Sequence, residues 1–139
     1  MLDASATLAW LIDRVDPTEA RLASETLLTL RSEDAAVPAL WFAEIANGIL
    51  VAERRGALDL AKSNLFLGMV SGLPIEQDAA RTSALQPEVL KIARACRLTA
   101  YDATYLELAL RTGRTLATFD RQLADAARKA SARVFGDAP

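Results

Sequence analysis

Histidine is absent from this chain of 139 residues, and cysteine occurs once, as Cys96. Without histidine, the chain cannot form a Ser–His–Asp or Cys–His catalytic group, a histidine-ligated zinc or haem site, or a histidine pH switch. A single thiol forms neither an internal disulfide nor a cysteine-based zinc site. Any enzyme chemistry must therefore use carboxylates, hydroxyls, basic side chains or a hard, oxygen-preferring ion such as Mg²⁺ or Mn²⁺.

Long apolar runs are also missing. The longest stretch without a charged residue runs over 13 residues, from Ser63 to Ile75, and contains two glycines and a proline. A transmembrane helix needs about 20 apolar residues, so none is expected. The first residues include an acid, Asp3, and lack the basic region and apolar core of a secretory signal. We therefore expect a cytoplasmic protein.

The length fits one domain covering residues 1–139. Apolar residues make up 52% of the chain, enough for a core that needs no disulfide, and charged residues make up 24%, which argues against disorder.

Charge is unevenly placed along the chain. Residues 1–80 carry twelve acids and six bases, whereas residues 81–139 carry six acids and ten bases. Within the basic half, Lys91, Arg94 and Arg97 recur every three residues and would fall within an arc of about 120° on a helix. They are candidates for binding an RNA backbone. The alternative is an ordinary solvated helix face.

Short apolar runs alternate with longer segments of helical spacing, which indicates a mostly parallel sheet covered by helices on both faces. Expected strands are 1–2, 35–37, 73–75, 115–118 and 132–135. Expected helices are 5–12, a segment after Pro17, 38–55, 58–70, 79–95 with a kink or break at Pro87, 101–111 and 121–129.

Two aspartates follow expected strands directly. Asp3 ends the first strand, and Asp120 comes just after the strand at 115–118. In open α/β sheets, ligands bind beyond the carboxyl ends of the strands, so we expect these carboxylates to converge. Each could instead serve as a helix N-cap, a role that stabilises by about 1 kcal/mol.

Two further acids complete the candidate set. Asp102 stands at the expected start of a helix, three residues after Thr99, in a pattern that resembles a capping box. Glu44 interrupts the most apolar helix, where an unpaired carboxylate is costly. Four clustered carboxylates would repel one another, and a divalent cation would relieve that repulsion and supply Lewis-acid chemistry.

Four motifs in this order resemble the PIN domain family and, within it, the VapC-type toxins of bacterial toxin–antitoxin pairs. They are Leu2–Ala6, Trp41–Asn47, Leu98–Tyr105 and Leu116–Asp120, of which the third is the most specific.

The resemblance implies a three-layer α/β/α sandwich with a mostly parallel sheet of about five strands, and a metal-dependent ribonuclease. By this resemblance Asp3 and Asp102 correspond to Mg²⁺ ligands, while Asp120 and Glu44 complete the metal and water site. We count Asp120 as a third metal ligand.

Ser5 and Thr118 match small hydroxyl positions that line such a site. The family also implies two partners besides RNA: a small antitoxin protein that neutralises the toxin, and a second copy of the chain in a homodimer. One departure is Ser131, which stands where a glycine turn is expected.

Two other functions stay open. The opening Asp3–Thr7 partly matches a phosphatase of the haloacid dehalogenase type, although Ser5 replaces its second aspartate. A non-catalytic binding module would keep the acids as helix caps. Four aromatic side chains could stack on unpaired bases, but at helical spacing beside alanines they more often belong to the core: Trp10, Trp41, Tyr101 and Tyr105. At least Trp10 and Trp41 are expected to be mostly buried.

Overall fold

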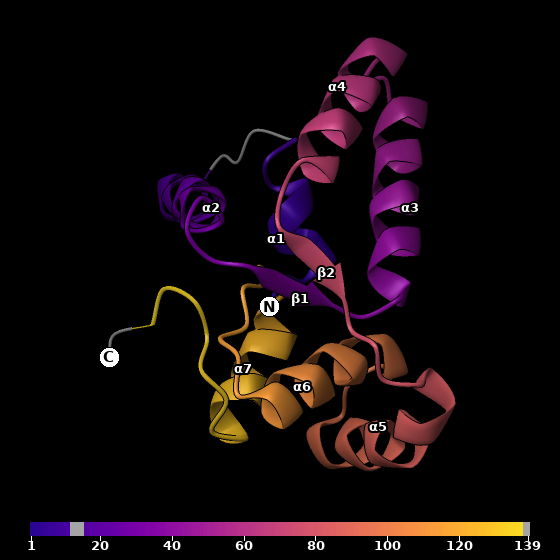
Figure 1. Ribbon diagram of the computed structural model, residues 1–139, viewed down its shortest axis with the longest axis vertical. Helices are drawn as coiled ribbons and strands as arrows, with labels where there is room; N and C mark the ends of the chain where they lie inside the picture. Colours follow the sequence, from indigo (N-terminus) through magenta and orange to yellow (C-terminus); the bar gives the residue numbers. More distant parts are fainter. Residues whose placement is uncertain (12–15, 138–139) are drawn as a thin grey trace.

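The computed structural model describes residues 1–11 and 16–137, and its regular sheet consists of two short parallel strands near the middle of the molecule (Figure 1). Strand β1 (Ala35–Val37) pairs with β2 (Ile75–Gln77), with Ala35 opposite Ile75. The second strand begins two residues later than the expected 73–75, because pairing with β1, and not the apolar run alone, determines its bounds.

The expected sheet of about five strands is wrong for the described residues. The segments at 1–2, 115–118 and 132–135 make only isolated parallel bridges, Leu2 with Ala117 and Leu116 with Val134. The Leu2 N–H also donates to the Ala36 carbonyl at 3.3 Å, so the first segment lies beside β1. Each pair of neighbouring segments shares one bridge and no continuous ladder, so these segments are not regular strands.

Seven helices occupy the described part of the chain, and Figure 1 shows α1 to α4 on one side of the strands and α5 to α7 on the other. They are α1 (Ala4–Leu8), α2 (Pro17–Thr29), α3 (Leu40–Arg54), α4 (Leu60–Ser71), α5 (Thr82–Cys96), α6 (Ala100–Thr112) and α7 (Arg121–Lys129). The expected helix at 5–12 is shorter, and residue 12 lies outside the described residues. None of the helices described is both long and apolar enough to cross a bilayer.

Local signals explain most helix ends. Asp16, Asp59, Thr99 and Asp120 accept backbone N–H groups at the starts of α2, α4, α6 and α7. Gly113 ends α6 in the left-handed conformation, with φ of 65°.

Two positions carry unusual backbone. Of the kink or break expected at Pro87, the break is wrong: α5 is continuous through Pro87, because the missing proline N–H removes one helical hydrogen bond without ending the helix. Ser131 has φ of 61°, so it adopts the left-handed turn that a glycine would favour.

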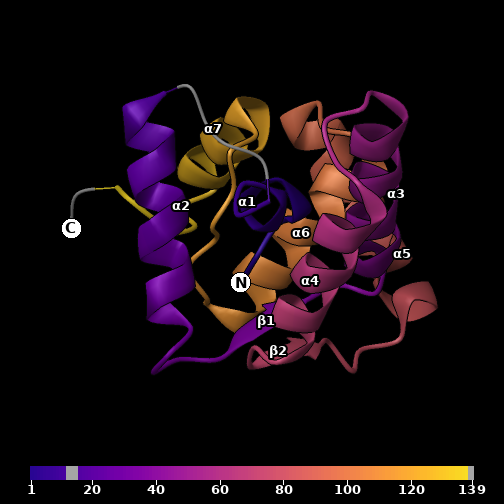
Figure 2. The ribbon, with the colours of Figure 1, turned by 90° about the horizontal axis from the view of Figure 1, so that it is seen from above.

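Helix α1 is central. It packs between α2 and the pair α3 and α4, as the two ribbon views show (Figure 2). The contact with α3 is close, because a Cβ at Gly48 would overlap the Leu8 side chain. Trp41 is 2% exposed, as expected, and its Nε1 donates to the Thr7 hydroxyl at 3.3 Å, while Trp10 is half-buried.

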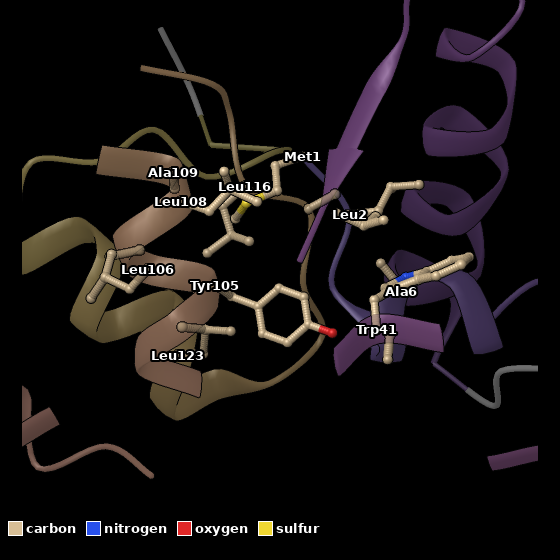
Figure 3. Close-up of a cluster of buried hydrophobic side chains, with 14 of the residues drawn as sticks. Met1, Leu2, Ala6, Trp41, Tyr105, Leu106, Leu108, Ala109, Leu116 and Leu123 are labelled. Atoms are coloured by element: carbon tan, nitrogen blue, oxygen red, sulfur yellow. The ribbon is translucent and has the colours of Figure 1, made fainter. Parts of the chain in front are cut away.

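The main core joins these helices to α6 and α7. Figure 3 shows Tyr105 and Leu106 of α6, Leu123 of α7 and Trp41 of α3 gathered around the first residues of the chain. The Tyr105 ring is 1% exposed, and its hydroxyl points away from α6. This polar atom inside an apolar cluster leads to the candidate site.

Candidate active site

Asp3 is a buried carboxylate held by two hydroxyls. It occupies the N-cap position of α1 yet makes no side-chain capping hydrogen bond, and it is 7% exposed. Its Oδ2 accepts from Ser5 Oγ at 2.5 Å and from Thr118 Oγ1 at 2.6 Å. The carboxylate is therefore positioned by side chains 113 residues apart in sequence, whose hydroxyls lie 3.4 Å from each other.

Burial raises the pKa of Asp3 above its ordinary value, and the hydroxyls of Ser5 and Thr118 oppose that rise. A buried acid without a cationic partner is costly when ionised. The N-cap position alone does not account for the burial of Asp3, and its surroundings favour binding of a positive charge.

Glu44 of α3 is the second acid of the cluster. It is half-buried, and the Tyr105 hydroxyl donates to its Oε2. Burial is the main reason that the pKa of Glu44 is raised; the hydrogen bond from Tyr105 lowers it, and the negative charges of Asp3 and Asp102 raise it further. Glu44 thus lies within electrostatic reach of both aspartates, and Tyr105, whose own pKa is raised chiefly by burial, remains a hydrogen-bond donor.

Asp102 stands in the first turn of α6. Its backbone N–H donates to Thr99 Oγ1 at 3.1 Å, and Thr99 Oγ1 donates to its Oδ2 at 2.6 Å. The side chain therefore has a local role at the helix start while its charge acts on Glu44.

Asp120 caps α7 and adjoins Asp3 through Thr118. Its Oδ1 accepts the Leu123 N–H at 2.8 Å, which is the helix-cap alternative considered for this residue. Its own N–H donates to Thr118 Oγ1 at 3.0 Å, the same hydroxyl that donates to Asp3. A further link is the Phe119 N–H, which donates to Ser5 Oγ at 2.9 Å. The predicted hydroxyl residues therefore tie the two aspartate segments together.

Carboxylates are the ligands that a hard cation prefers, but these acids do not form a three-carboxylate metal site. Among the residues that the structure describes, no group of three or more His, Cys, Asp or Glu side chains is placed to hold a metal ion. The assignment of Asp3, Asp102 and Asp120 as metal ligands stays a prediction. Mg²⁺ commonly binds one or two carboxylates and keeps several waters, so the buried Asp3, with further carboxylates nearby, suits such an ion.

The predicted basic row on α5 is not one helical face. Arg97 follows the end of the helix in the left-handed conformation, with φ of 54°, so the arc calculated for a continuous helix does not apply to it. Its carbonyl accepts from Gln122 Nε2 at 2.7 Å, and Lys91 pairs with Glu88 at 3.1 Å. Lys91, Arg94 and Arg97 are all exposed.

Sequence reasoning missed Tyr105 as the partner of Glu44, which lies 61 residues earlier. A signal was available. Tyr105 comes three residues after Asp102, and residues three apart share one face of a helix. A tyrosine on the face of the acid was therefore a candidate for the same site.

The family of the chain follows from comparison with known proteins. The family model of the PIN domain matches residues 1–129, which includes all four acids and both hydroxyl residues. A search of curated proteins gives no match. The chain therefore belongs to the PIN domain family, whose members are typically metal-dependent nucleases.

Proposed function

We propose that the protein is a Mg²⁺-dependent endoribonuclease and the toxin of a toxin–antitoxin pair. The observation that carries this proposal is the buried Asp3 carboxylate, held by two hydroxyls, with Glu44 under the negative charge of both Asp3 and Asp102. In a PIN domain, such a group of acids is suited to a divalent cation and a phosphodiester.

Asp3 and Asp102 would hold Mg²⁺ or Mn²⁺, with Asp120 as a further ligand. When bound, the ion lowers the pKa of a coordinated water and stabilises negative charge on the phosphate. Ser5 and Thr118 fix the orientation of Asp3 by donating to a single carboxylate oxygen, Oδ2.

Glu44 orients water and accepts its proton. Its raised pKa brings it closer to neutral pH, where a carboxylate is a more effective general base, and the Tyr105 hydroxyl fixes its position. With no histidine in the chain, a histidine acid–base pair that activates the RNA 2′-hydroxyl is not available.

Lys91, Arg94 and Arg97 would bind the RNA backbone from the C-terminal part of α5 and the turn after it. For the protein partners, the supporting observation is apolar exposure on α3 and α4. Six of the large hydrophobic side chains exposed there are Phe42, Leu50, Leu60, Leu65, Leu67 and Met69. This surface would take the antitoxin or a second copy of the chain, in the cytoplasm.

The test is cleavage of RNA by the purified protein with Mg²⁺, with EDTA, and with EDTA followed by excess Mg²⁺. The proposal expects cleavage that EDTA removes and Mg²⁺ restores, and it expects Asp3→Asn and Asp102→Asn to lose most of it. Asp59→Asn is the matched control, because Asp59 caps α4 and is not one of the four acids of the candidate site. Cleavage that survives EDTA, or that survives both site substitutions, contradicts the proposal.

The toxin role has a separate test. Expression of the wild-type chain should arrest bacterial growth, and Asp3→Asn should not. Co-expression of a small DNA-binding protein encoded next to the gene should restore growth. Active ribonuclease without growth arrest would refute the toxin role alone.

A further inference from the structure

A cavity of about 530 Å³ lies between α3, α5 and α6, and two of these helices, α3 and α6, also carry Glu44 and Asp102. It is lined by residues that follow the two strands directly, Pro38 after β1 and Asp78 after β2, and by side chains of the three helices. The helical side chains include Leu40 of α3, Ser83 and Gln86 of α5, and Tyr101, Thr104 and Glu107 of α6.

On α3 and α6, residues that line the cavity lie close in sequence to acids of the candidate site. Leu40 lines the cavity, and Glu44 lies one turn further along α3. Tyr101 lines the cavity, and Asp102 is the next residue of α6. The four acids do not line the cavity themselves, so a ligand there would contact the residues next to Glu44 and Asp102 on these two helices.

The lining combines apolar walls with a few hydrogen-bonding side chains. Ser83 and Gln86 can donate and accept, and Thr104, whose hydroxyl donates to the Ala100 carbonyl at 2.8 Å, can accept. The two acids of the lining are both paired with Arg111. Its Nη2 lies 2.6 Å from Asp78 Oδ2, and its Nε lies 2.7 Å from Glu107 Oε1. The single positive charge of Arg111 offsets half of the negative charge of this acidic pair, which would otherwise repel a nucleic acid.

Tyr101 provides an aromatic face at this cavity, with 66% of its surface exposed. It is the only cavity-lining side chain among the described large hydrophobic residues that are strongly exposed; most of the others belong to α3 and α4. A surface for a second protein chain would gather several such residues, whereas one ring beside a partly open cavity suits a single planar group.

We propose that this cavity binds one unpaired base of the RNA, next to the phosphate held at the acid group, with Tyr101 stacking on the base. The inference rests on the proposed ribonuclease function and adds a subsite to it. Stacking on an aromatic side chain tolerates any base, so the subsite selects single-stranded RNA, and Ser83, Gln86 and Thr104 add preference among bases through its polar edge.

The experiment measures RNA binding without cleavage. A short fluorescein-labelled single-stranded RNA is titrated with protein in EDTA, and anisotropy gives the Kd. Tyr101→Ala should raise the Kd about 5- to 150-fold, the loss of one base stack, and Tyr101→Phe should stay within about twofold of the wild type. Leu110→Ala, an exposed apolar residue of the same helix outside the cavity, should leave the Kd unchanged.

An RNA backbone that carries no bases provides the second arm. The wild-type protein should have a higher Kd for this base-free backbone than for the intact RNA. For Tyr101→Ala the two Kd values should be nearly equal, because the variant has already lost the stacking contact. The proposal is overturned if the Kd of Tyr101→Ala equals that of the wild type, or if removing the bases raises the Kd of both proteins by the same factor. It is also overturned if the wild type does not bind the RNA.

Sedimentation of the same variants tests the rival occupant. If Tyr101→Ala converts a dimer into monomers, the cavity is a subunit contact and the base subsite is wrong. These outcomes are distinct from failure of the ribonuclease proposal, which is judged by Mg²⁺-dependent cleavage and by Asp3→Asn.

Discussion

At the scale of single residues, the site depends on keeping acidic side chains close together inside a protein. Asp3 is buried and Glu44 is half-buried, and the pKa of each is raised above its ordinary value, in both cases chiefly by burial. Ionising them costs more in the folded chain than in the unfolded chain, so without metal these residues reduce stability at neutral pH. This arrangement makes sense when the acids serve a ligand.

Glu44→Gln should therefore leave the metal-free protein as stable as the wild type or more stable at neutral pH. Because the folded pKa of Glu44 lies above its ordinary value of 4.5, the wild type loses stability as pH rises from that value through the folded pKa. The advantage of the variant should disappear below about pH 4, where the glutamate is protonated in both states.

Urea unfolding in EDTA at the two pH values checks this prediction. Glu76→Gln, at an exposed position of β2, controls for removal of one surface charge. A variant that is clearly less stable than the wild type at neutral pH would show that Glu44 stabilises the fold.

Tyr105→Phe should lower both stability and activity. The ring is buried and phenylalanine keeps its packing, so the change removes mainly the hydrogen bond to Glu44. Loss of a hydrogen bond to a carboxylate costs about 1–3 kcal/mol in free energy of unfolding. Denaturant unfolding and RNA cleavage are the measurements, with the exposed Tyr101→Phe as matched control. Wild-type stability and activity would remove Tyr105 from the site.

The sequence alone made three of these acids candidates for the site. Asp3 and Asp120 were identified from their places after extended segments, and Glu44 from its cost in an apolar helix. The structure places Thr118 between the two aspartates and brings Glu44 within electrostatic reach of Asp3. The hydrogen bond from Tyr105 depends on how α3 packs against α6, which no local pattern contains.

At the scale of helices and strands, one acid has two roles that substitutions can separate. Asp120 caps α7 and belongs to the predicted site. Asparagine is also a good N-cap, so Asp120→Asn should keep stability while losing activity, whereas Asp120→Ala should lose activity and about 1 kcal/mol of stability.

Thermal unfolding and RNA cleavage distinguish the two roles. Asp59→Ala removes the equivalent cap of α4 and should cost similar stability without affecting cleavage. If Asp120→Asn cleaves RNA like the wild type, Asp120 is a helix cap only.

Two helical glycines should respond in opposite ways to alanine. Gly68 of α4 has open space where a Cβ would lie, so Gly68→Ala should stabilise by up to about 1 kcal/mol. At Gly48 of α3 the added Cβ would overlap Leu8 of α1, so Gly48→Ala should destabilise by about 1–3 kcal/mol. Chemical denaturation of both variants is the check, and equal gains would mean that α1 and α3 are not closely packed.

Element types were more predictable from the sequence than their lengths. The helices at 40–54, 100–112 and 121–129 lie close to the expected ranges because caps and a terminal glycine mark their ends. The strand at 75–77 was displaced, since its partner Ala35–Val37 determines which residues pair. Pro87 was overestimated as a helix breaker, because the remaining hydrogen bonds of α5 keep it continuous.

At the scale of the whole molecule, extended segments distant in sequence bring the site together. The parallel bridge between Leu2 and Ala117 places Asp3 beside Thr118, and the N–H of Asp3 donates to the Ala117 carbonyl at 2.9 Å. The alternation of extended and helical segments along the sequence predicts the parallel direction of the strands and the helices on both sides of them. It does not predict the number of regular strands, because a run of two to four apolar residues can satisfy its backbone with one bridge.

In the proposed reaction, the four acids promote hydrolysis of RNA with water as the nucleophile. The most direct measurement is the chemistry of the new ends after cleavage of a single-stranded RNA in Mg²⁺, with Asp3→Asn as the inactive control. Attack by water should leave a 5′-phosphate on one fragment and a 3′-hydroxyl on the other. A 2′,3′-cyclic phosphate would mean that the RNA 2′-hydroxyl attacked, and it would contradict the assignment of Asp3, Glu44, Asp102 and Asp120 to a metal and water site.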